Sequence, residues 1–152
     1  MSDSDLESLS DRLRRLEDLE EIRQLCIDYG AYLDGGDFAS YAELFAAHGE
    51  VLLGPLGRAR GPAAIRRLLE ARLTGQQGLA YHLIANPQVR LDGDRATSIV
   101  AWAVLARDSG HGGPILTLLG HHRDVLIREH GRWRFLRREG HLDLPSKLPS
   151  GA

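Results

Sequence analysis

The chain has 152 residues, of which 43% are hydrophobic and 26% are charged, a composition typical of one globular domain with a sizeable core. The net charge of −2 excludes a strong positive field, so we expect neither nucleic acid nor a membrane as a partner. Cys26 is the only cysteine, which excludes an internal disulfide and favours a reducing compartment.

The N-terminal residues carry no recognisable secretory signal. Residues 1–10 are acidic and lack an apolar core, and no apolar run approaches the ~20 residues that a membrane span requires. We therefore expect a cytoplasmic protein. Neither an internal repeat nor a linker is visible, so we expect a single domain over residues 1–152, with residues 1–15 as a leading helical extension and residues 142–152 as an irregular tail.

The first half of the chain has the periodicity of helices. A long amphipathic helix is predicted to end at Gly35-Gly36, because glycine adopts the left-handed cap conformation without strain. Residues 18–21 resemble a capping box, so this helix is expected to restart there. Asp37 is predicted to cap a short second helix, whose apolar side reaches Phe45. In the first helix, apolar residues recur at three- and four-residue steps with rare slips: Leu9, Leu13, Leu16, Ile22, Cys26, Tyr29 and Leu33.

Strand-like periodicity dominates the second half of the chain. A short strand is predicted at residues 50–53, and Pro62 opens a third helix. From residue 79 onward the period changes to two, and turn signals at residues 92–94 and 130–131 separate the strands. The first strand is expected at residues 81–85, to bend at Asn86-Pro87 and to continue over residues 88–91. Further strands are expected at residues 96–106, 115–128 and 132–139. Helices first and a long meander last predict an α+β fold: a cone-shaped barrel in which three N-terminal helices pack on a strongly curved, mostly antiparallel sheet.

Two residues stand out as candidates for chemistry. Asp34 lies in the last helical turn before Gly35-Gly36, a place from which a carboxylate can point into a cavity. His82 is a lone histidine in the apolar run of residues 81–85. If the two side chains meet, the carboxylate orients the imidazole for work as a general base. The alternative is that Asp34 only ends the helix and that His82 is a hydrogen-bonded core residue.

A series of motifs lies in a fixed order along the chain: Tyr29-x-x-x-x-Asp34-x-Gly36-Asp37, Leu44-Phe45, Gly61 at a helix start, His82 with Asn86-Pro87, Asp92-Gly93-Asp94-x-Ala96, and Gly131-x-Trp133-x-Phe135. From about residue 16 to residue 140, this order resembles the SnoaL-like group of the nuclear transport factor 2-like superfamily. Proteins of this shape include scytalone dehydratase, the lindane dehydrochlorinase, polyketide cyclases and the small subunit of ring-hydroxylating dioxygenases. The motifs are more specific for the fold than for the reaction.

The resemblance implies roles for particular side chains. Dehydratase-like relatives pair an aspartate of the first helix with a histidine of the sheet, which places a catalytic dyad on Asp34 and His82. The dehydrochlorinase-like pattern places a substrate hydrogen-bond donor on Tyr29. It also places on Arg138 a cation that stabilises an oxyanion or a departing anion. The alternative for Arg138 is a solvated strand residue.

Two adjacent histidines, His121 and His122, lie on one predicted strand. Their side chains point to opposite faces, so only one of them can face the interior of the cone. A scytalone dehydratase-like enzyme uses a second histidine from this sheet, whereas related sequences usually place a tyrosine where His122 stands. We take His121 forward as the catalytic candidate, with a structural role for both histidines as the alternative.

Together these features predict a cofactor-independent lyase, dehydratase-like, that acts on a small hydrophobic or aromatic molecule. His82 would remove a proton from an acidified carbon while Asp34 stabilises the imidazolium. The alternatives are an isomerase or cyclase with the same dyad, a non-catalytic small-molecule-binding domain, and an accessory domain like the dioxygenase small subunit. The pocket is expected to be lined by Tyr32, Phe45, Leu52, Trp102, Val104, Leu116 and Leu118.

Neither a cofactor nor a metal is expected, whereas self-association is. The sequence contains no Gly-x-Gly-x-x-Gly, P-loop, His-x-x-x-His or Cys-x-x-Cys motif, so we expect neither a nucleotide cofactor nor a bound metal. The long strands at residues 96–106 and 115–128 expose a sheet face that needs cover. We therefore expect a homodimer or a homotrimer.

Overall fold

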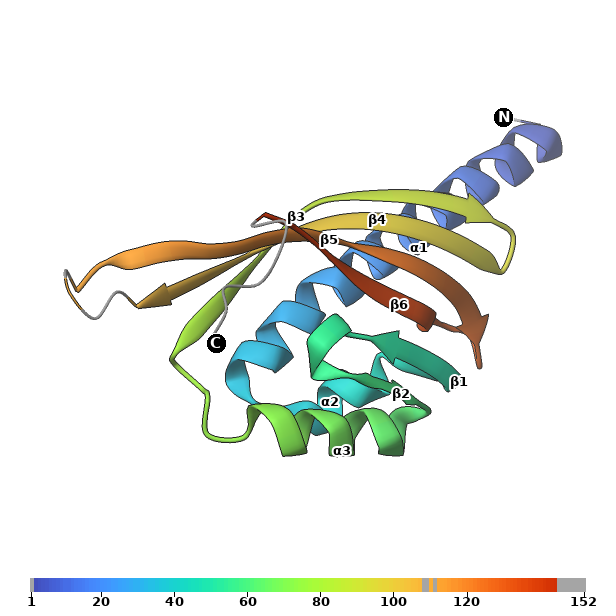
Figure 1. The fold of residues 1–152 in the computed structure, drawn as a ribbon. Coiled ribbons are helices and arrows are strands. Elements are labelled where there is room, and N and C mark those ends of the chain that lie inside the picture. The colour runs from blue at the N-terminus through green and yellow to red at the C-terminus, as the bar shows by residue number, and fades with distance from the viewer. Residues whose placement is uncertain (1, 108–109, 111, 145–152) are drawn as a thin grey trace.

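The computed structural model describes residues 2–107, 110 and 112–144. Over these residues the chain folds into three α-helices, a short 3-10 turn (η1) and a six-stranded sheet (Figure 1). The elements follow in the order α1 (Asp3–Gly35), α2 (Phe38–Glu43), β1 (Phe45–Leu52), η1 (Gly54–Leu56), β2 (Arg58–Arg60), α3 (Pro62–Leu73), β3 (Ala80–Asp92), β4 (Arg95–Arg107), β5 (Pro114–Glu129) and β6 (Arg132–Leu144).

The sheet is mixed but mostly antiparallel. Its strand order is β2-β1-β6-β5-β4-β3, and β1 runs parallel to β6 while the other neighbours are antiparallel. In Figure 1 the long strands curve over α1, and α2 and α3 lie on the same side of the sheet. This arrangement confirms the predicted α+β cone, and it places the interior between the concave sheet and the helices.

The turns and bends of the sheet occur where the sequence predicts them. Gly93 and His130-Gly131 have positive φ angles in the two hairpin turns. Asn86 also has a positive φ, of 52°, and the pairing register shifts between Ala85 and Gln88. A bulge of this kind bends its strand and increases the local twist. Residues 81–85 and 88–91 therefore form one strand, β3, with the predicted bend at Asn86-Pro87.

Two predicted boundaries are wrong, both because a neighbouring strand extends the ladder. Phe45 does not lie on the second helix: α2 ends at Glu43, and Phe45 opens β1 opposite Phe135 of β6. Residues 142–144, predicted as part of an irregular tail, are the end of β6 and pair with β5. The rest of that predicted tail lies outside the described residues.

Helix α1 is continuous, so the predicted restart at residues 18–21 is wrong. The helix begins with a capping box between Ser2 and Asp5. The carboxylates of Asp18 and Glu21, which suggested a cap, accept hydrogen bonds from residues of β5 and β6 instead. Asp18 accepts hydrogen bonds from Arg128 at 2.6 Å and from the Trp133 indole at 3.0 Å. These charged contacts fix the middle of α1 against β5 and β6.

The apolar residues of α1 lie on two faces rather than on one. Between Leu16 and Ile22 the helix advances six residues, a net rotation of about 240°, so the two side chains cannot share a face. Ile27 stays exposed, whereas four residues after this step are buried in the core: Ile22, Leu25, Cys26 and Tyr29. The residues before it are exposed: Leu6, Leu9, Leu13 and Leu16. Among the described residues, neither α1 nor any other helix combines the length and apolar character that a membrane crossing needs.

A buried ion pair lies at the centre of the core. Arg138 of β6 is fully buried and donates to both carboxylate oxygens of Asp124 on β5, at 2.8 and 2.9 Å. Ser98 of β4 donates a third hydrogen bond to Asp124, at 2.8 Å. The guanidinium carbon lies 4.4 Å from the ring centre of Tyr29 and 4.1 Å from that of Phe135. Arg138 is therefore neither a solvated strand residue nor a group that faces the interior cavity.

Burial by itself opposes the charge on Arg138, but the Asp124 carboxylate and its hydrogen bonds outweigh this effect and raise the pKa of the guanidinium above its ordinary value. Arg138 therefore keeps its positive charge in the core. Removing one partner would leave an uncompensated charge in the core, which is among the most destabilising single changes in proteins.

We expect Asp124→Asn to lower the free energy of unfolding by about 3–5 kcal/mol, because it leaves the Arg138 charge buried without its partner. The matched control is Glu139→Gln, which removes the exposed carboxylate that accepts from Arg137 at 2.9 Å. That exposed pair should contribute less than about 1 kcal/mol. Urea unfolding at pH 7 measures both values, and equal losses in the two variants would contradict a stabilising role for the buried pair.

Candidate active site

A cavity of about 350 Å³ lies between the concave face of the sheet and the helices. Its walls are mainly apolar, with a few polar side chains, which is the usual make-up of a small-molecule site. The cavity is lined from the helices by Tyr29, Leu33, Tyr41 and Leu73, from the η1 turn and its flank by residues 53–56, and from the sheet by His82, Trp102, Val104, Leu118, His122, Gly140 and Leu142.

The structure brings Asp34 and His82 together at the wall of this cavity. The Nδ1 atom of His82 lies 2.6 Å from Asp34 Oδ1, and both side chains are largely buried. The second carboxylate oxygen, Oδ2, accepts a hydrogen bond from the His82 backbone N–H at 2.9 Å. One carboxylate thus holds both the ring and the backbone of His82. In the described part of the chain, the other ring nitrogen, Nε2, forms no hydrogen bond.

Two glycines explain how Asp34 reaches β3. Gly36 caps α1 with a φ of 72°, which ends the helix just after the aspartate. Gly30 lies one turn earlier, where a Cβ atom would come within 2.8 Å of the Ile84 side chain. A residue without a side chain is needed there for α1 to lie this close to β3. The close approach brings the Asp34 carboxylate within hydrogen-bonding distance of His82.

His122, not His121, is the second histidine of the cavity. Its ring is buried, meets the ring of Tyr29 edge-on at 4.9 Å, and lies 5.8 Å from that of Trp102. Its Nδ1 atom has no hydrogen-bond partner among the described residues. Burial, reinforced by the charge of Arg138, holds the pKa of His122 well below its usual value of 6.5. His122 is therefore neutral at pH 7.

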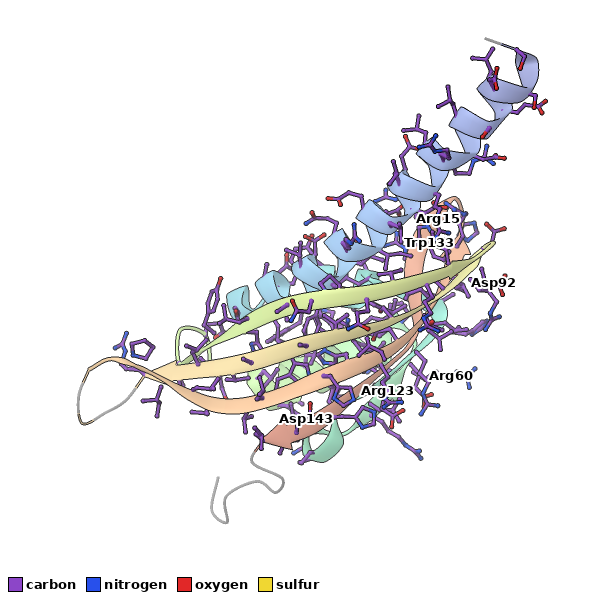
Figure 2. The ribbon with its side chains drawn as sticks, turned by 90° about the horizontal axis from the view of Figure 1, so that it is seen from above. Arg15, Arg60, Asp92, Arg123, Trp133 and Asp143 are labelled. Carbon is purple, nitrogen blue, oxygen red and sulfur yellow. The ribbon has the colours of Figure 1, made fainter. Side chains whose placement is uncertain are left out.

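His121 was chosen as the catalytic candidate, but it does not face the cavity. Its side chain lies on the outer face of the sheet. Its Nδ1 atom is 2.8 Å from Asp143, and its ring stacks on that of His141 at 4.9 Å. Arg123 donates to its other ring nitrogen at 3.4 Å, and Figure 2 marks Arg123 and Asp143 in this region. Strand alternation could have resolved the choice: Leu118, predicted to line the pocket, has the same parity as His122.

Tyr29, the residue expected to donate a hydrogen bond to the substrate, lines the cavity. Its ring is buried between the Arg138 guanidinium and the edge of His122. Burial, with only partial compensation from the Arg138 charge, raises the pKa of Tyr29 to about 12. The hydroxyl therefore stays protonated and keeps a hydrogen to donate. Arg138 touches the cavity only indirectly, through the ring of Tyr29.

Only some of the predicted pocket residues line the cavity. Trp102, Val104 and Leu118 line the cavity, whereas Tyr32, Phe45, Leu52 and Leu116 do not. Phe45 packs in the core on Tyr41 and Phe135, with ring centres 5.7 and 5.5 Å away. A register shift after Val104 pairs Leu116 with Leu105 and leaves Leu116 61% exposed. Local periodicity does not reveal a bulge of this kind, which is why the prediction for Leu116 failed.

The cavity residues that the prediction missed come mostly from outside the central strands. Leu33 lies on α1 next to the predicted Tyr32, and residues 53–56 belong to the turn after β1. Leu142 comes from the end of β6 that was predicted to be irregular. Within residues 2–107, 110 and 112–144, no group of three or more His, Cys, Asp or Glu side chains is placed to hold an ion.

The sequence matches the model of the SnoaL-like domain over residues 14–139. The chain belongs to the SnoaL-like family. A comparison with curated proteins gave no match. Among solved structures, this SnoaL-like domain is similar to an NTF2-like protein with a cystatin-like fold from Novosphingobium aromaticivorans, with 33% identity, a TM-score of 0.84, and coverage of 96% of this chain and 94% of that chain.

Two further structures share the fold of this SnoaL-like domain. A protein of unknown function with a cystatin-like fold from Nostoc punctiforme is 26% identical, with a TM-score of 0.74 and coverage of 87% of this chain and 94% of that one. A protein named as a candidate scytalone dehydratase from Novosphingobium aromaticivorans is 23% identical, with a TM-score of 0.71 and coverage of 91% and 96%. At 23% identity, the similarity to this candidate scytalone dehydratase supports the fold alone.

The lowered pKa of His122 predicts a loss of stability in mild acid. Below about pH 6.5 the unfolded chain binds a proton at His122 that the folded chain does not, so the free energy of unfolding falls as pH decreases. The loss continues down to the folded-state pKa, at no more than about 1.4 kcal/mol per pH unit. Urea unfolding between pH 7 and pH 5 should show a weaker pH dependence in His122→Asn than in the parent.

The control for this experiment is His130→Asn. His130 is exposed in a turn with a φ of 50°, a conformation that asparagine tolerates. This variant should keep the pH dependence of the parent. If His122→Asn also keeps it, the buried ring is not the group that resists protonation.

Proposed function

We propose that this protein is a cofactor-independent lyase of the dehydratase type, in which His82 is the general base. The observation that carries the proposal is the 2.6 Å contact between His82 Nδ1 and Asp34 Oδ1 at the wall of an apolar cavity. Membership of the SnoaL-like family supports it, because the same fold is found in a candidate scytalone dehydratase. The proposed substrate is a small hydrophobic or aromatic molecule.

The Asp34 carboxylate gives His82 its chemical role. It accepts a hydrogen bond from Nδ1–H, so the neutral ring carries its lone pair on Nε2, the nitrogen on the far side of the ring. Nε2 can then take a proton from a carbon made acidic by a neighbouring carbonyl group. The resulting imidazolium is stabilised by the adjacent carboxylate, as in other histidine–aspartate pairs.

The same histidine can complete the elimination. As the carbon–hydrogen bond electrons form the new double bond, the carbon–oxygen bond to the leaving hydroxyl breaks. The imidazolium returns its proton to this oxygen, which departs as water and restores neutral His82. The reaction therefore balances without a second acid, provided that the proton and the hydroxyl lie on the same side of the substrate.

Tyr29 and His122 would hold the substrate oxygens during this reaction. The Tyr29 hydroxyl stays protonated because burial raises its pKa to about 12, so it can donate to a carbonyl oxygen as negative charge develops there. His122 is neutral and lacks a partner for Nδ1 among the described residues, so it can share a hydrogen bond with a substrate. Both residues line the same cavity as His82.

The size and composition of the cavity support a small, largely apolar substrate. The volume of about 350 Å³ lies near the lower end of the range for small-molecule sites, roughly 300–1,000 Å³. The walls include Leu33, Val104 and Leu118, with Trp102 beside His122. Such walls exclude water, which strengthens the charge interactions that the dyad depends on.

The proposal is tested by screening small aromatic β-hydroxy carbonyl compounds for loss of water. We expect His82→Gln and Asp34→Asn to lower kcat by about 10²–10⁴-fold, because each removes part of the general base. KM should change little, because the apolar walls are untouched. The control is Asp28→Asn, an aspartate of α1 whose carboxylate binds Gln24 rather than the dyad.

Other outcomes separate the alternatives. A product of unchanged mass would indicate an isomerase or cyclase that uses the same dyad. Ligands that bind without turnover would favour a non-catalytic binding domain. Full activity of a folded His82→Gln variant would rule out a dyad mechanism of any kind.

A further inference from the structure

The N-terminal part of α1 extends away from the rest of the domain. All side chains from residue 4 to residue 17 are exposed, and the first buried side chain of the helix is that of Asp18. In both Figure 1 and Figure 2 the helix projects past the edge of the sheet, with the N-terminus at its far end. At 1.5 Å per residue, residues 4–17 form a rod of about 21 Å.

This rod carries a stripe of four exposed leucines. Leu6, Leu9, Leu13 and Leu16 are 48%, 47%, 57% and 63% exposed. At 100° per residue they fall within an arc of about 80° on one face of the helix. The buried residues of α1 that follow, from Ile22 to Tyr29, are centred about 170° away from this arc. The domain's own core therefore cannot cover the leucine stripe.

The spacing of the leucines is that of a coiled coil. Steps of three, four and three residues are the a and d positions of two heptads, with Leu6 and Leu13 at a and Leu9 and Leu16 at d. The next a and d positions hold Glu20 and Arg23, so the apolar seam ends after Leu16. A seam of this kind is suited to another helix with the same repeat, rather than to a flat surface or a sheet.

We propose that residues 4–17 of α1 form a parallel two-stranded coiled coil with the same segment of a second copy of this chain. The charges beside the seam favour this partner and this orientation. In a parallel pair, Arg12 at position g faces Glu17 of the partner subunit at position e, and symmetry repeats the contact on the other side. An antiparallel pair with the same leucine contacts would bring the two Arg12 side chains together.

The geometry of the domain is compatible with this pairing. Because the seam faces away from the core side of α1, the two domains would lie on opposite outer sides of the coiled coil. The cavity lies near the other end of the helix: Leu16 and Asp34 are separated by about 27 Å of helix. The pairing is therefore independent of the chemistry proposed for the cavity.

The test is sedimentation of the full chain over a range of concentrations. We expect the parent to dimerise and Leu9→Glu/Leu13→Glu to raise the dissociation constant by about 100-fold or more, because each seam position is lost twice in a symmetric pair. The matched control is Ser4→Glu/Ser8→Glu, which adds the same charge to the opposite face of the same exposed turns. The control should dimerise like the parent, and far-UV circular dichroism checks that all three chains are folded.

A charge exchange tests the orientation separately. Arg12→Glu and Glu17→Arg should each weaken the dimer, and the double variant should restore it, because the parallel pair places these residues opposite each other. A parent that stays monomeric at all concentrations would overturn the proposal, leaving the stripe to a different partner. A dimer that survives Leu9→Glu/Leu13→Glu would also overturn it, because the contact would then lie elsewhere, as on the outer face of the sheet.

Discussion

The interaction on which the rest of the structure depends is the buried pair of Arg138 and Asp124. It joins β6 to β5, takes a further hydrogen bond from Ser98 of β4, and places the guanidinium against the ring of Tyr29 on α1. A charge in the core needs a charged partner, so these four elements have little freedom to move relative to one another. The pair lies behind one wall of the cavity and determines where Tyr29 is held.

The same pair also influences the chemistry of the cavity without entering it. Its positive charge lies close enough to His122 to oppose protonation of that ring, in addition to the effect of burial. The ring of His82, by contrast, lies beside a carboxylate, with its Nδ1 atom 2.6 Å from Asp34 Oδ1. Two histidines of one cavity thus have different electrostatic surroundings, one beside a cation and one beside an anion.

Much of this arrangement could be predicted from the sequence, where the evidence is local. Asp34 before a glycine pair and His82 in an apolar strand were recognised as candidates, because helix ends and strand periods are short-range features. The resemblance to the SnoaL-like group was needed to favour their pairing. Arg138 was misplaced, because its burial depends on Asp124, which lies on a different strand and leaves no local signal. Leu116 was misplaced by a bulge, which changes the face of every residue beyond it. The break in the apolar spacing between Leu16 and Ile22 was visible in the sequence. That the leucines before it are exposed could be inferred only by knowing which face of α1 packs on the core.

The parallel pairing of β1 with β6 has a consequence for how the chain folds. The hairpins from β3 to β6 pair strands that follow one another along the chain, so each can form after closing only a short loop. Phe45 and Phe135, by contrast, are about 90 residues apart, and their pairing requires almost the whole domain to be present. We therefore expect β1 and its flanking helices to join a meander that is already formed, and the cavity to close only in this last step, since its η1 wall follows β1.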